Sequence, residues 1–387
     1  MRKVYVDYAA TTPLDPTVLE AMTPYFTLVY GNASSIHAMG LEARQAIEDS
    51  RKTIAGFMNA EPEELIFTGS ATEANNMVLK GFAFKEGKRK THIAISTVEH
   101  DSVLNVAKWL EQQGFKVTYL PVDEYGLLDL EELENALRQG VSLVSIIHAN
   151  NEIGTIEPIK EIGRICHEYG AYFHTDAAQS FGKIPIDVKN VEVDLMTVNA
   201  HKLYGPKGVG ALFIKKDVKI EPLLHGGGHE FGLRSSTENV PNIVGFAKAV
   251  ELRREEMEPE AQRLTRLRDR LIKGILEIEE TYLNGHPSKR LPNNANFRFS
   301  FIEGESLVLL LSDEGVYAST GSACSSSSGE PSHVLLAIGL KPEEVHGSLR
   351  ISLGKYNTEE DIDYILETLP KVVKKLREIS PIKALRS

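Results

Sequence analysis

The chain has 387 residues and a formal net charge of −11, with 42% hydrophobic and 25% charged residues. This composition is typical of a globular protein of about two domains that can bury a substantial core. The acidic balance argues against direct binding of nucleic acid through a basic surface. There are two cysteines, Cys166 and Cys324, and no CxxC pair, which excludes a disulfide framework and a four-thiolate zinc site.

The sequence also lacks the hydrophobic stretches that direct proteins to membranes. The first residues, "MRKVYVDYAATTPLD", contain no apolar run of the length found in a secretion signal. No window approaches the ~20 apolar residues that a membrane span requires. We therefore expect a cytoplasmic protein that has no membrane association.

From about residue 64, short apolar runs alternate with longer helical patterns. The runs that we predict to be strands lie at 64–69, 91–96, 116–122, 143–150, 171–176, 194–199 and 209–214. Helical patterns separate the first five of them. Apolar runs that are buried on both faces and separated by amphipathic helices indicate an α/β fold with a mainly parallel sheet.

The pattern changes near residue 250. A long charged helix is predicted over 251–278, followed by an alternating strand over 294–302 and a helix over 305–315. We expect a large domain at 14–257 and a smaller α+β domain formed by 1–13 and 258–387. The smaller domain would carry a Ser- and Gly-rich loop at about 319–331 that contains Cys324.

Ligands of open α/β sheets bind outside the carboxyl ends of the strands. After the first predicted strand, "TGSATEANN" joins small residues to a helix start, where free backbone N–H groups and Thr72 could hold an anion. The same letters also fit an ordinary capping box of Ser70 and Glu73. On this segment alone the two interpretations stay open.

Polar residues follow three further strands. His100 stands after the second, where a histidine could stack on a flat ring, transfer protons or simply be a loop residue. Asn150, Asn151 and Glu152 follow the fourth, and Asp176 and Gln179 follow the fifth. A carboxylate in such a low-dielectric place requires a positive partner, for which a protonated ring nitrogen is suitable.

Lys202 follows the sixth strand in "VNAHKLYGPKGVGALFI". A lysine at a strand exit is commonly a solvated surface residue. Combined with the anion site, His100 and Asp176, however, an imine-forming lysine is what pyridoxal 5'-phosphate (PLP) needs. The sequence therefore predicts a PLP site at this edge of the sheet.

The two cysteines have different surroundings. Cys166 lies in the amphipathic "EIGRICHEYG" and is predicted to be a core residue. Cys324 lies in "STGSACSSSSGEPSH", which indicates an exposed thiol that acts as a nucleophile or carrier.

His225 and His229 are separated by glycines, so we predict no metal site there. Arg350, on a predicted strand, is a candidate clamp for a substrate carboxylate.

Taken together, several motifs resemble the cysteine desulfurases of the NifS/IscS type, in the class-V aminotransferase family. They are "DYAATTPLDP", "YGNASSIHAMG", "GSATEANN", "VEHDSV", "ANNEIGT", "HTDAAQS", "NAHKLYGPKGVGAL", "GGGHEFGLRSSTENVPNIVGF", "STGSACSSSSGEPSHVLLAIGL" and "SLRISLGKYNTEEDID". The similarity runs nearly end to end. It implies the PLP-dependent transferase fold of aspartate aminotransferase (fold type I), a homodimer, and conversion of L-cysteine to L-alanine.

The resemblance also implies roles for individual residues. Cys324 would take the sulfur of L-cysteine as a persulfide, and Lys202 and His100 would act with it in catalysis. The cofactor would be held by Ala71, Thr72, His100, Asn151, Asp176, Gln179, Asn199, His201 and Lys202, and by Thr237 of the second subunit. Asn151 and Arg350 would bind the substrate carboxylate. The Ser- and Gly-rich loop is similar to that of the group that supplies iron–sulfur cluster scaffolds, although other sulfur acceptors are also compatible.

Three positions depart from the family pattern. Asn199 replaces a usual serine or threonine beside the phosphate, Ala178 replaces a frequent threonine, and Ala33 replaces a usual proline. None of these changes removes a reacting group. We expect weaker but intact cofactor binding from Asn199.

Two other functions remain compatible with these residues. One is a different PLP activity on the same fold, such as a selenocysteine lyase or an aminotransferase, because fold alone does not determine the reaction. An aminotransferase has no use for Cys324. The other is a sulfur-relay or cluster scaffold with Cys324 as a transient iron–sulfur ligand, which need not keep Lys202.

Overall fold

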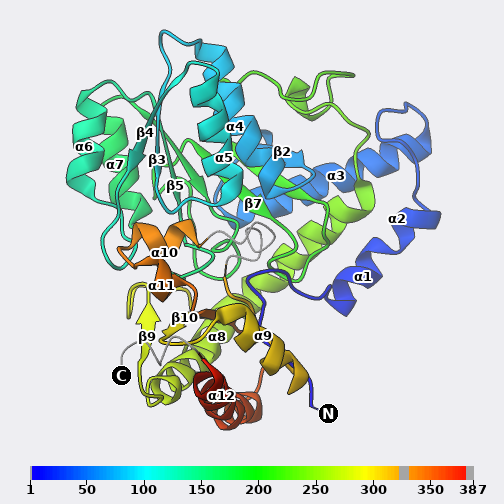
Figure 1. The fold of residues 1–387 in the computed structure, drawn as a ribbon. Helices are drawn as coiled ribbons and strands as arrows, with labels where there is room; N and C mark the ends of the chain where they lie inside the picture. The colour runs from blue at the N-terminus through cyan, green and yellow to red at the C-terminus, as the bar shows by residue number, and fades with distance from the viewer. Residues whose placement is uncertain (1, 322–330, 381–387) are drawn as a thin grey trace.

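The computed structural model describes residues 2–321 and 331–380, and a seven-stranded sheet forms its larger part (Figure 1). The strand order is β2-β8-β7-β6-β5-β3-β4. The strands are β2 (Leu65–Thr68), β3 (His92–Ser96), β4 (Lys116–Leu120), β5 (Leu143–Ile147), β6 (Tyr172–Asp176), β7 (Leu195–Asn199) and β8 (Gly210–Ile214). Only β8 runs antiparallel to its neighbours β2 and β7, so the predicted mainly parallel sheet is confirmed.

Helices cover both faces of this sheet, which explains why its strands read as continuous apolar runs. One face packs on α4 (Ala71–Glu86) and α5 (Asp101–Gln112). The other face packs on α1 (Pro16–Met22), α3 (Ala38–Phe57), α6 (Leu130–Arg138), α7 (Ile159–Glu168) and the first half of α8 (Val240–Ile275). Along β3, Ile95 points to the α4 and α5 side of the sheet and Ala94 to the opposite side. Cys166 on α7 is fully buried, as predicted.

A second core lies around a three-stranded antiparallel sheet of order β12-β10-β9. Its elements are β9 (Thr281–Asn284), β10 (Asn294–Phe299), α9 (Gly304–Asp313), β12 (Ser348–Ser352) and α12 (Glu359–Ile379). The N-terminal strand β1 (Val4–Tyr5) pairs in parallel with β11 (Val316–Tyr317), and Val4 and Val6 are buried in this core. Short helices also lie at α2 (Pro24–Thr27), α10 (His333–Ala337) and α11 (Pro342–Val345), with 3-10 turns at Pro62–Glu64 and Glu230–Gly232.

The long helix α8 connects the two cores (Figure 1). It begins at Val240, well before the predicted start at 251, with a proline in its first turn where no backbone donor is needed. Its first half carries Phe246 and Val250 into the large core, and its second half carries Leu267 and Leu271 into the small one. The predicted domain division at residues 257 and 258 falls inside this helix and stays a prediction.

Candidate active site

A cavity of about 340 Å³ opens where the carboxyl ends of the central strands meet the starts of α4 and α5. This volume lies within the range of roughly 300–1,000 Å³ that is usual for small-molecule sites. Of the residues predicted to form the site, those that line the cavity are Ala71, Thr72, His100, Asn151, Asp176, Gln179, Asn199, His201, Lys202 and Arg350. Residues more than 270 positions apart in the chain are thus brought together at the predicted edge of the sheet.

Lys202 lies in the turn that follows β7, and its ammonium group contacts the N-terminal segment. Its Nζ donates hydrogen bonds to the carbonyl oxygen of Ala9 and, at 2.8 Å, to that of Ala10. Its backbone N–H donates to Asn199 Oδ1 at 3.3 Å. Asn199 therefore shapes the turn that places Lys202 in the cavity.

The start of α4 presents backbone donors to the same cavity. Ser70 caps the helix by accepting from Glu73 N at 3.1 Å. The Glu73 carboxylate does not close a capping box on Ser70, because it accepts from Gly69 N at 2.8 Å and pairs with Arg234 at 2.7 Å. The first-turn N–H groups at Ala71 and Thr72 have no intrahelical acceptor and border the cavity, as an anion site requires.

His201 lines the same cavity. Its Nδ1 lies 3.2 Å from Thr11 Oγ1. Burial, reinforced by the neighbouring charges of Lys202 and Lys207, lowers the pKa of His201 to about 4. The ring is therefore neutral near pH 7 and can offer one donor without adding a charge.

Asp176, at the end of β6, is only 3% exposed and accepts hydrogen bonds from neutral groups. Asn75 Nδ2 donates to its Oδ2 at 2.7 Å, and Ala178 N donates to its Oδ1 at 2.9 Å. In the described part of the chain no cationic side chain forms an ion pair with it. A buried carboxylate with only neutral donors is well placed to accept a positively charged group of a ligand.

His100 belongs to the same network. Asn75 Nδ2 also donates to Ser102 Oγ at 2.8 Å, and that hydroxyl lies 2.8 Å from His100 Nδ1. The Ser102 N–H donates to the same Nδ1 at 3.1 Å. Because this nitrogen accepts, the neutral ring carries its proton on Nε2.

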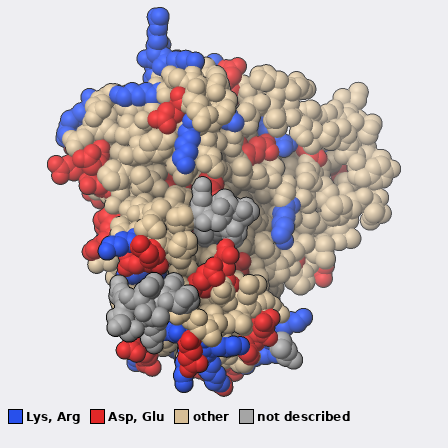
Figure 2. Space-filling model, in the orientation of Figure 1, with Lys and Arg blue, Asp and Glu red and all other residues tan. Residues whose placement is uncertain are grey.

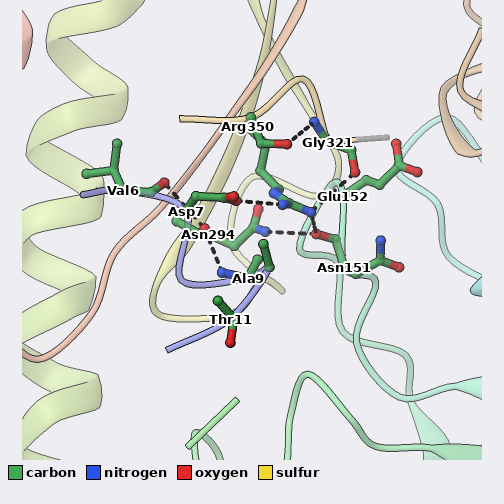
Figure 3. A network of polar contacts seen from close by, with 12 residues as sticks. Val6, Asp7, Ala9, Thr11, Asn151, Glu152, Asn294, Gly321 and Arg350 are labelled. Carbon is green, nitrogen blue, oxygen red and sulfur yellow. Dashed lines mark hydrogen bonds and ion pairs between the residues drawn. The ribbon is translucent and has the colours of Figure 1, made fainter. Parts of the chain in front are cut away.

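Arg350 on β12 lines the cavity and is almost fully buried. Figure 3 shows its guanidinium beside Asp7, Asn151 and Gly321. Its Nη2 pairs with Asp7 Oδ1 at 2.8 Å, and its Nη1 donates to the carbonyl oxygens of Asn151 and Gly321 at 2.9 and 3.3 Å. Its Nε is buried and has no hydrogen-bond partner among the described residues. The guanidinium is thus fixed in orientation at the edge of the cavity, where its positive charge favours a carboxylate.

Comparison with known proteins places this arrangement in a family. The profile of the family described as "Aminotransferase class-V" matches residues 4–365. The chain belongs to this family. It is 53% identical over 378 residues to "Cysteine desulfurase IscS 1" of Archaeoglobus fulgidus, covering 98% of this chain and 99% of the relative.

Solved structures agree with that assignment. A structure titled "NIFS-LIKE PROTEIN" matches with a TM-score of 0.92 and 42% identity, covering 97% of this chain and all of that one. Another, "SspA in complex with cysteine", matches with a TM-score of 0.82 and 39% identity, covering 92% of this chain and all of that one. The expected fold type I and the resemblance to the cysteine desulfurases of the NifS/IscS type are therefore confirmed.

Two further side chains line this class-V site: Glu152, which the sequence analysis named after the fourth strand without giving it a role, and His333, which it did not single out. Glu152 is buried, which raises the pKa of its carboxyl group, and it accepts from Ser332 Oγ at 2.6 Å. His333 at the start of α10 borders the cavity and donates from Nε2 to the carbonyl oxygen of Glu99 at 2.8 Å. The sequence places Glu152 at the ligand-binding edge of the sheet but assigns it no role, and nothing local in "GEPSHVLL" indicates that His333 borders the cavity.

Two predicted site residues, Thr237 and Cys324, need separate mention. Thr237 is exposed in the segment before α8 and does not line it. Cys324 lies outside the described residues, so its predicted role stays a prediction. Within residues 2–321 and 331–380, no group of three His, Cys, Asp or Glu side chains is arranged to hold a metal ion, and no helix is long and apolar enough to cross a membrane.

Proposed function

We propose that the chain is a PLP-dependent cysteine desulfurase, which converts L-cysteine to L-alanine and transfers the sulfur to Cys324. The observation that carries this proposal is the buried Asp176 carboxylate, which faces the cavity beside Lys202 and has only neutral donors. The names of the relatives of this chain support the same reaction. Sulfur would then pass to an iron–sulfur cluster scaffold or another acceptor, in the cytoplasm.

The residues of the cavity fit a phosphate-bearing pyridine aldehyde. The start of α4 offers N–H groups for the phosphate, and Asp176 offers a negative partner for a protonated ring nitrogen. Lys202 supplies the amine that forms the covalent link, with Gln179, Asn199, Asn151 and His201 around it. When bound, the cofactor acts as an electron sink that stabilises negative charge at the substrate Cα.

The side chains of the protein would provide orientation and proton transfer. Asp176 keeps the ring nitrogen protonated, and Asn75 keeps the carboxylate of Asp176 in place. Lys202 Nζ moves the proton of the substrate Cα, and His100 supplies or receives a proton at Nε2. Arg350 and Asn151 orient the substrate carboxylate at the other end of the cavity.

The transfer of sulfur balances without an external oxidant. The carbon–sulfur bond of L-cysteine breaks, its electron pair stays on carbon, and that carbon takes up a proton to give L-alanine. The Cys324 thiolate forms the new sulfur–sulfur bond, so the enzyme is left as a persulfide. A thiolate is the nucleophile required for this step.

A homodimer is part of the proposal. The segment around α2 and the start of α3 carries large exposed apolar side chains, among them Leu28, Tyr30 and Ile36, and Ile36 is 90% exposed. The lobe on the right of Figure 2, over these elements, is almost free of charged residues. A surface of this kind marks an interface in a protein of otherwise charged surface. Dimerisation would let Thr237 complete the phosphate site of the second subunit.

The first experiment is an absorption spectrum of purified protein loaded with PLP, before and after addition of L-cysteine. We expect a visible band that shifts on addition, with equal amounts of alanine and sulfide or persulfide formed. Lys202→Ala should lose the covalent band, and Cys324→Ala should keep the band but release no sulfide. A band that yields no alanine from cysteine would indicate another PLP activity. The absence of a band in wild-type protein would favour a sulfur-relay scaffold.

A further inference from the structure

A second lysine, Lys183, lies behind the predicted cofactor site and does not line its cavity. Its Nζ donates to Gln179 Oε1 at 3.1 Å. The other end of that amide, Gln179 Nε2, donates to the carbonyl oxygen of Ala9 at 2.8 Å. Because Lys202 Nζ donates to the same carbonyl oxygen, one amide and one carbonyl group connect the two lysines.

The two lysines also border a common internal space. A cavity of about 20 Å³ lies between them, which is room for roughly one water molecule. Burial, reinforced by the charge of Lys202, lowers the pKa of Lys183 to about 7, while Glu260 opposes this shift. The charged and titratable groups that face Lys183 are Tyr8, His201, Lys202, Tyr204, Arg253, Glu260 and Arg350.

Resting on the proposed function, we propose that Lys183 is a positioning residue that controls the Lys202–cofactor link through Gln179. Below a pH of about 7, where Lys183 is charged, its ammonium group donates to Gln179 Oε1, so the NH₂ end of the amide is directed to Ala9 O. Two neighbouring ammonium groups repel each other, so a charged Lys183 favours the neutral amine at Lys202. The neutral amine is the form that attacks a carbonyl carbon.

The test compares Lys183→Met, which removes the charge and the donor, with Lys183→Arg, which keeps both. The matched control is Lys189→Met, at an exposed lysine that pairs with Glu61. Two properties are measured without substrate: the pH at which the visible band of the PLP-loaded protein changes, and the rate at which cofactor-free protein forms that band. For Lys183→Met we expect the spectral transition to move to higher pH by about half a unit or more, and loading to slow. The transition pH and loading rate of Lys183→Arg should be closer to those of wild type, and those of Lys189→Met should equal the wild-type values.

The possible failures are distinguishable. An unchanged transition pH and loading rate in Lys183→Met, with a normal band, would overturn the role of Lys183 and leave the proposed function intact. A wild-type protein that forms no band would overturn the proposed function and this inference with it. Should Lys183→Met fail to fold, as judged by circular dichroism, Lys183→Gln is measured by the same criteria.

Discussion

The carboxylate of Asp7 accepts a hydrogen bond from Arg350 Nη2 at 2.8 Å, although the two residues are 343 positions apart in the chain. Arg350 is also held by the backbone of Asn151 and Gly321 (Figure 3). Asp7 does not line the cavity, so it holds the guanidinium from behind. It also neutralises part of a buried charge that would otherwise be costly to desolvate.

Replacing Asp7 by alanine should therefore weaken substrate binding more than turnover. Loss of one hydrogen bond to a buried charged group costs ~1–3 kcal/mol, so we expect KM for L-cysteine to rise about 5- to 150-fold. Asp7→Asn keeps an oxygen acceptor and should show a smaller increase. Steady-state kinetics of both variants with L-cysteine measure KM and kcat separately. A KM in Asp7→Ala equal to that of wild type would show that the contact does not support the substrate site.

The hydrogen bonds of Asn75 predict a second effect, on cofactor affinity. Asn75→Leu removes the donor to Asp176 Oδ2 and the donor to Ser102 Oγ, within a fully buried site. The loss of these hydrogen bonds should cost ~1–2 kcal/mol of binding free energy, so we expect the PLP dissociation constant to rise about 5- to 30-fold. Asn76→Ala is the matched control, because the half-buried Asn76 side chain donates to Thr72 O and, among the described residues, forms no hydrogen bond with Asp176 or Ser102. Equal affinities for the two variants, measured by fluorescence titration, would contradict the role given to Asn75.

The sequence predicted Lys202, Asp176 and His100 because each follows a strand, and parallel strands deliver such residues to one edge of a sheet. Asp7 could not be found in this way, because its contact depends on the packing of the N-terminal strand against β11 and the second core. Lys183 stands four positions after Gln179, but only the folded turn shows that its Nζ contacts that amide. Helix α3 was also missed, because its apolar positions are mixed with many charged residues.

A buried ion pair anchors the segment that precedes Thr237. Arg51 and Glu230 make two contacts of 2.8 Å, with side chains 3% and 4% exposed, and Glu230 also accepts from Phe67 N at 2.7 Å. Removing one partner leaves the other charge buried and unpaired. We therefore expect Glu230→Ala to lower the free energy of unfolding by about 3–5 kcal/mol.

Glu48 provides the matched control for this measurement. It also pairs with Arg51, at 3.2 Å, but its side chain is exposed to solvent. An exposed pair contributes ~0–1 kcal/mol, so Glu48→Ala should change stability little in urea unfolding. If Glu230→Ala and Glu48→Ala lowered the free energy of unfolding equally, the Arg51–Glu230 pair would be screened by solvent like a surface pair.

The buried histidines predict how stability depends on pH. His174 on β6 is fully buried between Ser145 Oγ at 2.8 Å and Thr197 Oγ1 at 3.1 Å, and burial lowers its pKa to about 3. The unfolded chain, with an ordinary value near 6.5, therefore binds a proton that the folded chain excludes. The contribution of this neutral histidine is complete above pH 6.5 and is lost progressively as the pH falls.

Between pH 6.5 and pH 5, this one group should lower the free energy of unfolding by about 2 kcal/mol, at ~1.4 kcal/mol per pH unit. His148, whose pKa burial lowers to about 4, should add a similar loss. His174→Gln removes the titration at that position, so its stability difference between pH 7 and pH 5 should be smaller than that of wild type. His225→Gln, at an exposed position, should leave the difference unchanged. Urea unfolding at both pH values measures it, and an undiminished difference in His174→Gln would mean that the folded protein accepts the proton at this site.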